Sequence, residues 1–139
     1  MSDQRIEPTL LSPYGGTLVD LMEPVEDLGE IISLANQLVS VQISERSMCD
    51  LELLATGAFS PLDRFMNSAD YESVLDKMRT SSGHIFPMPV ILPIDPGQDI
   101  IEGSQVALRN SKNELLALME VEEIYEWDRV DTARRVFGT

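Results

Sequence analysis

Apolar residues at helical spacing define a first helix in the middle of the chain. In residues 46–55, Leu51 and Ala55 lie one turn apart on the same face. Ser44 precedes the segment as a suitable N-cap, and Gly57 follows it as a residue that accepts the left-handed conformation at a helix end. The pattern therefore predicts a helix over 46–55.

A second helix is predicted just downstream. Its apolar residues fall at i, i+3, i+4 and i+7, namely Tyr71, Val74, Leu75 and Met78. Ser68 is the expected N-cap, and Lys77 and Arg79 stand in the last turn, where they favour the negative end of the helix dipole. Gly83 lies just beyond.

Two further segments have helical features. Near the end of the chain, Asp128 is expected to cap a short helix that closes at Gly138. Its inward face is predicted to carry Val130, Ala133 and Phe137. The apolar residues of 28–41 fit a helix at the beginning and a strand at the end, and this pattern leaves the boundary open.

Most strand patterns lie in the second half of the chain. Residues 17–22 alternate weakly, and residues 88–94 alternate clearly but lie among three prolines. Because proline donates no ladder hydrogen bond, 88–94 is expected at a sheet edge or an irregular barrel rim. A strand over 106–109, a four-residue hairpin turn over 110–113 and a return strand over 115–124 are also predicted.

The order of these elements favours one fold class. The strands cluster instead of alternating with helices, so a doubly wound parallel sheet is not expected. The pattern predicts an α+β domain with a small mixed β-barrel or sheet and flanking helices. Residues 1–12 are interpreted as an extended lead-in and residues 13–139 as the domain.

Charge and composition narrow the partners. The 139 residues include 24 acidic and 10 basic ones, for a formal net charge of −14. Such a surface repels nucleic-acid backbones and anionic membranes, so neither is expected as a partner. No apolar run approaches the ~20 residues that cross a bilayer. Cys49 is the single cysteine, so no intrachain disulfide is possible, and a cytoplasmic location is predicted.

Candidate catalytic chemistry is scarce. His84 is the only histidine, and it has no neighbouring ligand at metal spacing. No glycine-rich phosphate loop occurs, and Cys49 is interpreted as a small buried hydrophobe beside the helical face. We therefore assign no catalytic, cofactor-binding or metal-binding residue to this chain.

One loop is unusually apolar for a connection between helices. We single out as a candidate interdomain or structural motif the residues Phe59, Ser60, Pro61, Leu62, Arg64, Phe65 and Met66, together with Tyr71 on the following helix. Connecting loops are normally polar and run over the surface. This loop, called the aromatic loop below (residues 59–66), either packs into its own core or forms an interface, and both interpretations remain open.

The same loop carries a family resemblance. The stretches that match, in order, are residues 13–19 (PYGGTLV), 49–62 (CDLELLATGAFSPL), Phe65-Met66, Asp70-Tyr71, 86–90 (FPMPV) and 136–139 (VFGT). In these the chain resembles the N-terminal PUA-like domain of ATP sulfurylase (sulfate adenylyltransferase). Tyr14 and Arg64 depart from the usual family residues, which are His and Gly.

The resemblance implies a function for a larger parent enzyme. ATP sulfurylases adenylylate sulfate with MgATP and release pyrophosphate. Their nucleotide and sulfate motifs, including a Gln-x-Arg-Asn-Pro-x-His stretch, belong to a following catalytic domain and do not occur in this sequence. The expected partners are therefore that downstream domain, expected directly after Gly138-Thr139, and further copies in a homo-oligomer.

Several questions stay open under this resemblance. It does not say whether an adenylylsulfate kinase domain is fused to the parent. It also leaves two alternatives for the domain itself, a stand-alone PUA-like module that binds RNA and a regulatory domain that docks on a separate sulfurylase chain. The strongly acidic charge disfavours the RNA alternative.

Overall fold

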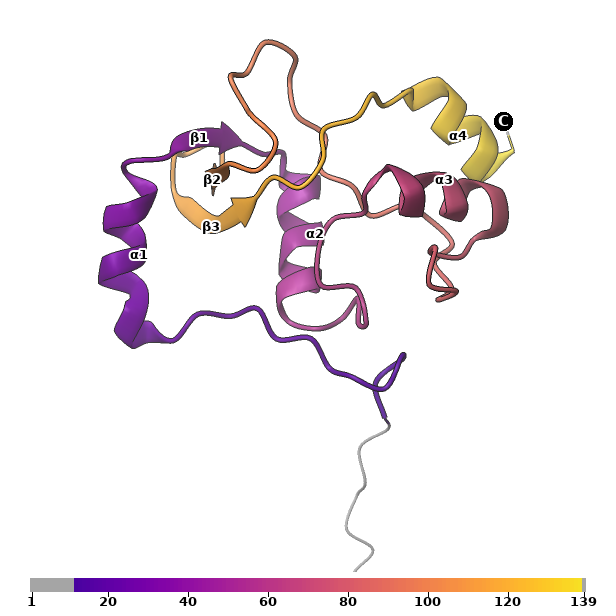
Figure 1. The fold of residues 1–139 in the computed structure, drawn as a ribbon, viewed down its shortest axis with the longest axis horizontal. Coiled ribbons are helices and arrows are strands. Elements are labelled where there is room, and N and C mark those ends of the chain that lie inside the picture. The colour runs from indigo at the N-terminus through magenta and orange to yellow at the C-terminus, as the bar shows by residue number, and fades with distance from the viewer. Residues whose placement is uncertain (1–11, 139) are drawn as a thin grey trace, which may run out of the picture.

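The computed structural model describes residues 12–138, and the sheet at its centre is small and mixed. Strands β1 (Val39–Gln42), β2 (Gln105–Arg109) and β3 (Leu115–Glu120) lie in that order across the sheet. β1 runs parallel to β2, and β3 runs antiparallel to it (Figure 1). The predicted α+β class is confirmed, and among residues 12–138 the β-structure is an open sheet, not a closed barrel. Residues 1–11 and Thr139, part of the predicted lead-in and of the closing motif, lie outside the described residues.

The hairpin between β2 and β3 forms where the sequence predicted it. The Asn110 side-chain oxygen accepts hydrogen bonds from the backbone N–H groups of Lys112 (3.0 Å) and Glu114 (2.9 Å). Asn113 adopts a left-handed φ of 63°, a conformation that asparagine tolerates well. The ladder shifts register between Leu108 and Arg109, which is the irregularity that a bulge introduces.

Besides the sheet, residues 12–138 form four α-helices and one 3₁₀ turn. They are η1 (Val25–Asp27), α1 (Leu28–Ala35), α2 (Glu45–Ala55), α3 (Ser68–Lys77) and α4 (Arg129–Phe137). Residues 28–41, in which the sequence left the boundary between helix and strand undecided, form helix α1 followed by strand β1. Ser44 caps α2 as predicted, because its hydroxyl accepts from the Ser47 N–H at 3.1 Å.

The predicted cap of α3 is wrong by one residue. Asn67, not Ser68, is the extended residue before the helix, and its side-chain oxygen accepts from the Asp70 N–H at 2.9 Å. Both residue types cap helices well, so their order in the sequence does not show which one stands outside the first turn.

Two predicted strands are wrong, and their hydrogen bonds explain why. In 17–22, the backbone N–H of Val19 donates to the Ser60 hydroxyl and that of Leu21 to the Ala55 carbonyl, so the segment is attached to the α2 end and its loop. In 88–94 the prolines remove donors, and one backbone bond, from Met66 N–H to the Val90 carbonyl (2.8 Å), holds the segment. The return strand also ends at Glu120, before the predicted Ile124.

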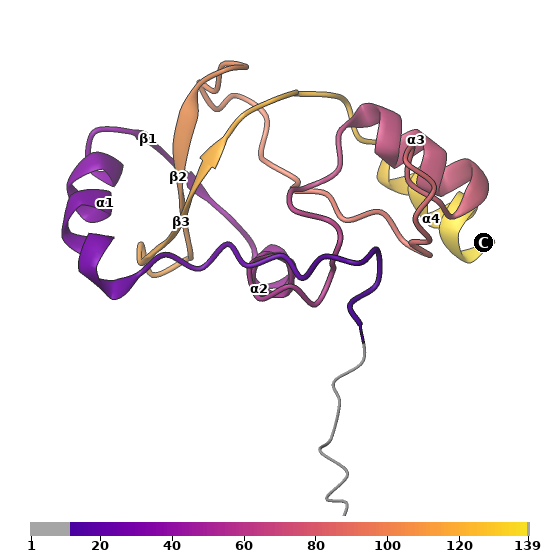
Figure 2. The same cartoon turned by 60° about the horizontal axis from the view of Figure 1, so that its bottom comes forward.

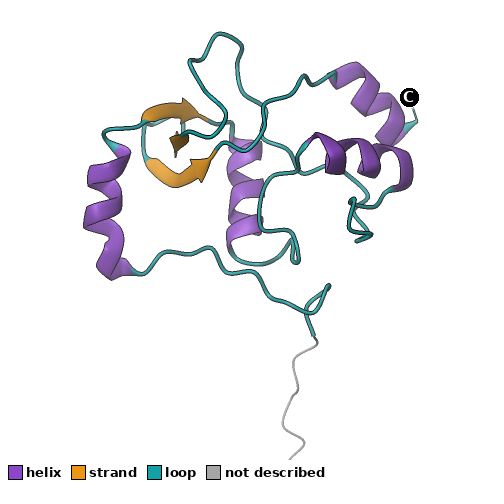
Figure 3. Cartoon of the chain, in the orientation of Figure 1, coloured by secondary structure: helices purple, strands orange, loops and turns teal. Residues whose placement is uncertain are grey.

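The core of this elongated molecule is divided into two buried clusters. The cluster between α2 and α3 contains Leu54, Leu62, Met66, Val74, Phe86 and Val90. The cluster on the sheet contains Val41, Ile43, Val106, Leu108 and Val121. Turning the molecule shows α1 and the sheet at one end, α3 with α4 at the other, and α2 between them (Figure 2). Irregular chain connects these two ends, as colouring by secondary structure makes plain (Figure 3).

Helix α4 has the predicted caps but the opposite orientation. The Asp128 carboxylate accepts from the N–H groups of Val130 and Asp131, both at 3.0 Å, and Gly138 closes the helix with φ 70°. Val130 and Phe137 are 68% and 64% exposed, so the prediction that they face inward is wrong. No residue of α4 is fully buried, and the side that meets α3 is held there by polar contacts, as described below. In the part of the chain that the structure covers, no helix has the length and apolar character that crossing a membrane requires.

Candidate functional site

The aromatic loop is anchored at its start by a buried serine. Ser60 is 6% exposed, donates to the Gly57 carbonyl (2.6 Å) and accepts from the Val19 N–H (2.9 Å). The first bond closes the turn after α2, and the second attaches the N-terminal segment 41 residues away. The Ser60 hydroxyl therefore has a structural role. Its hydrogen-bond partners are backbone groups, and none of them is a histidine.

Two glycines make this attachment possible. Gly57 has φ +87°, and a Cβ there would collide with the carbonyl oxygen of Val19. Gly15 has φ +80°, and a Cβ there would approach the Pro61 ring to 2.6 Å. Any larger residue at either position would meet both backbone strain and a neighbouring atom. The glycines thus allow the N-terminal segment to lie directly against the aromatic loop.

The apolar side chains of the loop contribute to the core between α2 and α3. Leu62 and Met66 are 8% and 2% exposed, and Phe59 and Phe65 are partly buried against them. The Val90 N–H also points at the Met66 sulfur, at 3.4 Å. The structure therefore places most of the loop in its own core, while Pro61 is partly covered and Arg64 remains exposed. A role of the loop in an interdomain contact stays a prediction.

A cleft of about 660 Å³ opens beside the loop, between the sheet and the α3–α4 end. Its apolar lining includes Leu51, Leu54, Phe65, Ile91, Leu92, Ile100, Met119 and Val121. Its polar rim is provided by the aromatic loop on one side and by residues 120–129 on the other. The volume and the mostly apolar lining are typical of binding sites.

Arg64 joins the two sides of the cleft mouth. Its guanidinium lies 3.0 Å from the Asp63 carboxylate and 2.6 Å from that of Glu122, 58 residues away. The hydrogen bond from Arg64 lowers the pKa of Asp63 below its ordinary value, and the two carboxylates raise the pKa of Arg64. Because these side chains are about half exposed, the ion pairs contribute little to the free energy of unfolding. Their main effect is to hold the two sides of the cleft mouth together.

Aromatic residues continue this rim. The Tyr125 hydroxyl donates to the Met66 carbonyl at 2.5 Å, and its ring lies 5.7 Å from that of Tyr71. Burial, with the nearby Glu123 charge as a smaller cause, raises the pKa of Tyr125. The guanidinium of Arg129 stacks over Trp127 at 5.1 Å from the ring centre.

Tyr71 has a structural place rather than a surface one. It is 5% exposed, and its hydroxyl hydrogen-bonds the hydroxyl of Thr132 on α4. Sequence reasoning did not find the other side of the cleft, formed by Glu122, Tyr125, Trp127 and Arg129. The available signal was two aromatic residues within a stretch rich in acidic residues, residues 120–128. Nothing in that stretch showed that it would lie opposite the aromatic loop.

The described residues offer little catalytic chemistry. No group of three His, Cys, Asp or Glu side chains suited to a metal ion occurs within residues 12–138. His84 contacts the Ser82 hydroxyl (3.1 Å) and the edge of Tyr14, whose own hydroxyl accepts from the Ile85 N–H at 2.7 Å. Cys49 is exposed, so its interpretation as a buried hydrophobe is wrong. The cleft and the aromatic loop are therefore better suited to binding another molecule or domain than to catalysis.

Comparisons of this sequence with known proteins agree on one family. The sequence profile described as PUA-like domain matches residues 11–139. A sulfate adenylyltransferase from Mycosarcoma maydis is 39% identical over 136 residues, which cover 92% of this chain and 23% of that protein. A sulfate adenylyltransferase from Synechococcus sp. is 37% identical over 131 residues, covering 93% of this chain and 33% of that protein.

A solved structure shares the fold as well. It is titled hexameric APS kinase from Thiobacillus denitrificans, and it superposes with a TM-score of 0.74 at 33% identity over 84% of this chain and 24% of that one. The chain thus spans between about a quarter and a third of the length of these relatives. These matches cover most of the chain and are not confined to one motif.

Proposed function

Because this chain belongs to the PUA-like domain family, we propose that it is the non-catalytic N-terminal domain of a sulfate adenylyltransferase. The parent enzyme would transfer the adenylyl group of MgATP to sulfate and release pyrophosphate, in the cytoplasm. One observation carries the proposal. Relatives named sulfate adenylyltransferase match more than nine-tenths of this chain, while the match spans only 23% to 33% of their own length.

The charges of the domain support a non-catalytic role. Transfer of a nucleotidyl group needs cationic side chains or a metal ion around the phosphates. In the described structure, Arg64 is paired with Asp63 and Glu122, and Arg135 with carboxylates of α3. With a formal net charge of −14, the chain as a whole disfavours the phosphates of ATP and a sulfate ion. MgATP would be held by the rest of the parent enzyme.

The domain's contribution would be to brace the catalytic domain. We place the contact on the aromatic loop and on the N-terminal segment that Ser60 holds against it. That segment leaves large apolar side chains in solvent, with Leu18, Met22 and Val25 exposed by 64%, 64% and 81%. Such a run of exposed apolar residues is characteristic of a surface that another domain covers.

An activity assay of the 139-residue chain tests the proposal. The chain would be incubated with adenosine 5′-phosphosulfate and pyrophosphate, and ATP formation compared with that of an intact sulfurylase at equal molar concentration. We expect no turnover and no calorimetric signal from MgATP. Turnover at the rate of the intact enzyme would overturn the non-catalytic role.

The coding sequence after Thr139 provides a second, independent test. A continuous reading frame that contains the Gln-x-Arg-Asn-Pro-x-His stretch is expected if the domain belongs to a larger sulfurylase. A stop codon at that position would instead favour a separate regulatory domain that docks on a sulfurylase chain.

A further inference from the structure

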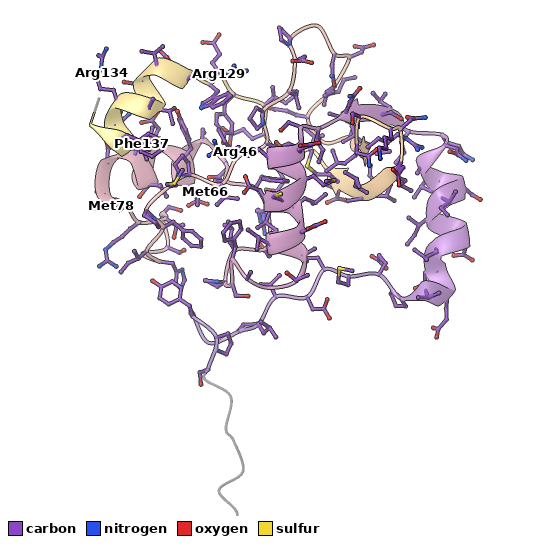
Figure 4. All side chains as sticks on the ribbon, turned by 180° about the vertical axis from the view of Figure 1, so that it is seen from behind. Arg46, Met66, Met78, Arg129, Arg134 and Phe137 are labelled. Carbon is purple, nitrogen blue, oxygen red and sulfur yellow. The ribbon has the colours of Figure 1, made fainter. Side chains whose placement is uncertain are left out.

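The described residues pack as two units, with helix α2 between them. Close contacts join α1 to the three strands of the sheet and α3 to α4, and we call these groups the sheet unit and the helical unit, which also includes the aromatic loop. The side chains of α2 divide between the two, since Met48 and Leu51 pack on the buried cluster of the sheet, whereas Leu54 belongs to the cluster between α2 and α3. Seen from behind, Met66 lies between α2 and α3, and the sheet lies on the other side of α2 (Figure 4).

The cleft separates the two units where α2 does not join them. Its lining takes residues from both buried clusters, with Val41 and Leu108 from the cluster of the sheet and Leu54 and Met66 from the cluster between α2 and α3. The two cores therefore border a space of about 660 Å³ instead of forming one continuous core. A boundary with little shared apolar burial is where a fold opens most easily.

The chain crosses this boundary through irregular segments. One crossing lies at residues 91 and 92, because Ile91 packs on the cluster between α2 and α3 and Leu92 on that of the sheet. A second lies at residues 124 and 125. The Ile124 N–H donates to the Glu102 carboxylate beside the sheet (2.8 Å), while the Tyr125 hydroxyl donates to the aromatic loop. Short irregular connections of this kind are where hinge motions occur in proteins.

One ion pair spans the cleft mouth between the units. Arg64 of the aromatic loop reaches Glu122, just after β3, at 2.6 Å, and no other ion pair found in residues 12–138 joins the two units. Both side chains are 53% exposed, so water and dissolved ions compete with the pair. The cleft mouth is thus closed by a contact that is easily broken.

We propose that the two units pivot about α2 and that the Arg64–Glu122 ion pair is a latch that keeps the cleft mouth closed. When the latch breaks, the mouth widens and the apolar lining of the cleft, together with Trp127, becomes accessible to solvent. Closed and open arrangements are then both populated, and salt favours the open one because it screens an exposed ion pair.

This inference concerns the chain itself and stands independently of the proposed function. Only its consequence for a parent enzyme rests on that function. Because α4 would lead into the catalytic domain, the latch would set the angle at which the sheet unit is held relative to that domain.

Acrylamide quenching of Trp127 fluorescence in the 139-residue chain tests the latch. Trp127 is the only tryptophan and lines the cleft, and acrylamide is neutral, so the charge of the rim does not by itself change the access of the quencher. Arg64→Gln and Glu122→Gln each remove one half of the latch and are expected to raise the quenching constant about twofold or more in low salt. In about 1 M NaCl the unmodified chain should approach the value of the variants.

Exchanging the two charges separates the latch from a general effect of substitution. The double variant Arg64→Glu/Glu122→Arg again places opposite charges across the mouth, so its quenching constant is expected to return towards that of the unmodified chain. Arg79→Gln is the matched control, because Arg79 is also exposed but donates to the Gly83 carbonyl (3.0 Å) near the end of α3. It should leave the quenching constant unchanged, and circular dichroism verifies that every variant folds.

Small-angle X-ray scattering separates a pivot from a local uncovering of Trp127. Only a pivot changes the distances between the two units, so the distance distribution of Arg64→Gln should differ from that of the unmodified chain, and that of the charge-exchanged variant should not. The inference would be overturned by unchanged quenching in both single variants, by an equal rise in the Arg79→Gln control, or by a charge-exchanged variant that quenches like the single variants. Raised quenching with unchanged scattering would also overturn it, because Arg64 would then only shield Trp127.

Discussion

Helices α3 and α4 lie side by side and carry similar patterns of apolar residues, yet they pack in opposite ways (Figure 1). On α3 the patterned residues Tyr71, Val74 and Leu75 are at most 8% exposed, whereas the fourth, Met78, lies at the left-handed C-cap and is 59% exposed. On α4 the patterned residues Val130 and Phe137 are more than 60% exposed. The periodicity identified which residues share a face in both helices. The direction of that face depended on what the opposite face offered to its neighbour.

The difference arises from the polar side chains of α4. The Thr132 hydroxyl donates to the Asp128 carbonyl at 2.8 Å, so its lone pairs are free to accept from the Tyr71 hydroxyl and from Trp127 Nε1 at 3.2 Å. Arg135 places its charge between Glu72 and Asp76. These contacts need the side of α4 that carries Thr132 and Arg135 on α3, so Val130 and Phe137 are left in solvent. An apolar stripe is thus a reliable sign of burial only when no set of polar partners competes for the same surface.

The largest expected effect comes from the same substitution made on each helix. Val74→Ala removes buried methyl groups from a side chain that is 1% exposed, and it should lower the free energy of unfolding by about 2 kcal/mol. Val130→Ala should change it by no more than about 0.5 kcal/mol, since the side chain is in solvent and alanine favours the helix. Urea titration at low protein concentration measures both. Equal losses would show that α4 buries its apolar face after all.

The polar interface between the helices should contribute the next largest effect. Tyr71→Phe removes the hydroxyl that donates to Thr132 and should cost about 1 kcal/mol, while the ring keeps its packing. Thr132→Val should cost at least as much, because it leaves the Tyr71 and Trp127 donors without an acceptor. The double variant should lose less than the sum of the two. Strict additivity would show that the two hydroxyls do not interact.

Substitutions of the two adjacent arginines of α4 test whether Arg135 holds the helix on α3 or only adds to the stability of the helix itself. Arg135→Ala removes the ion pairs with Glu72 and Asp76, so the amide hydrogens of α4 should exchange several-fold faster. Arg134→Ala is the matched control, and at a concentration where the chain is monomeric it should leave α4 exchange unchanged. Native-state hydrogen exchange measures both variants. Similar exchange in the two would argue against Arg135 as the residue that holds α4 on α3.

Sequence predicted the features of this molecule that depend on neighbouring residues and missed those that depend on distant contacts. The α+β class, the cap of α2, the hairpin at Asn110 and both caps of α4 were predictable, because each depends on neighbouring residues. The strands expected over 17–22 and 88–94 did not form, because residues 17–22 are bonded to the end of α2 and its loop, and residues 88–94 are bonded to the backbone N–H and sulfur of Met66. The cleft was not predictable for the same reason, since Arg64 meets Glu122 only through the tertiary fold.

The smallest expected effect concerns the ion pair between Arg64 and Glu122, which joins the segment before α3 to the segment before α4. Arg64→Gln should lower stability by no more than about 0.5 kcal/mol at pH 7, because the ion pairs with Asp63 and Glu122 are half exposed. The folded state lowers the pKa of Asp63, so this stabilisation is present above the ordinary carboxyl pKa and is lost as the pH falls through the folded value. Urea titrations of both proteins from pH 7 to about pH 3 should therefore converge towards acid, and Lys112→Gln should show no such convergence. A constant difference across that range would mean that Arg64 acts through packing alone, and the hydrogen bond from Tyr125 to Met66 would then be the main link between the two helix entrances.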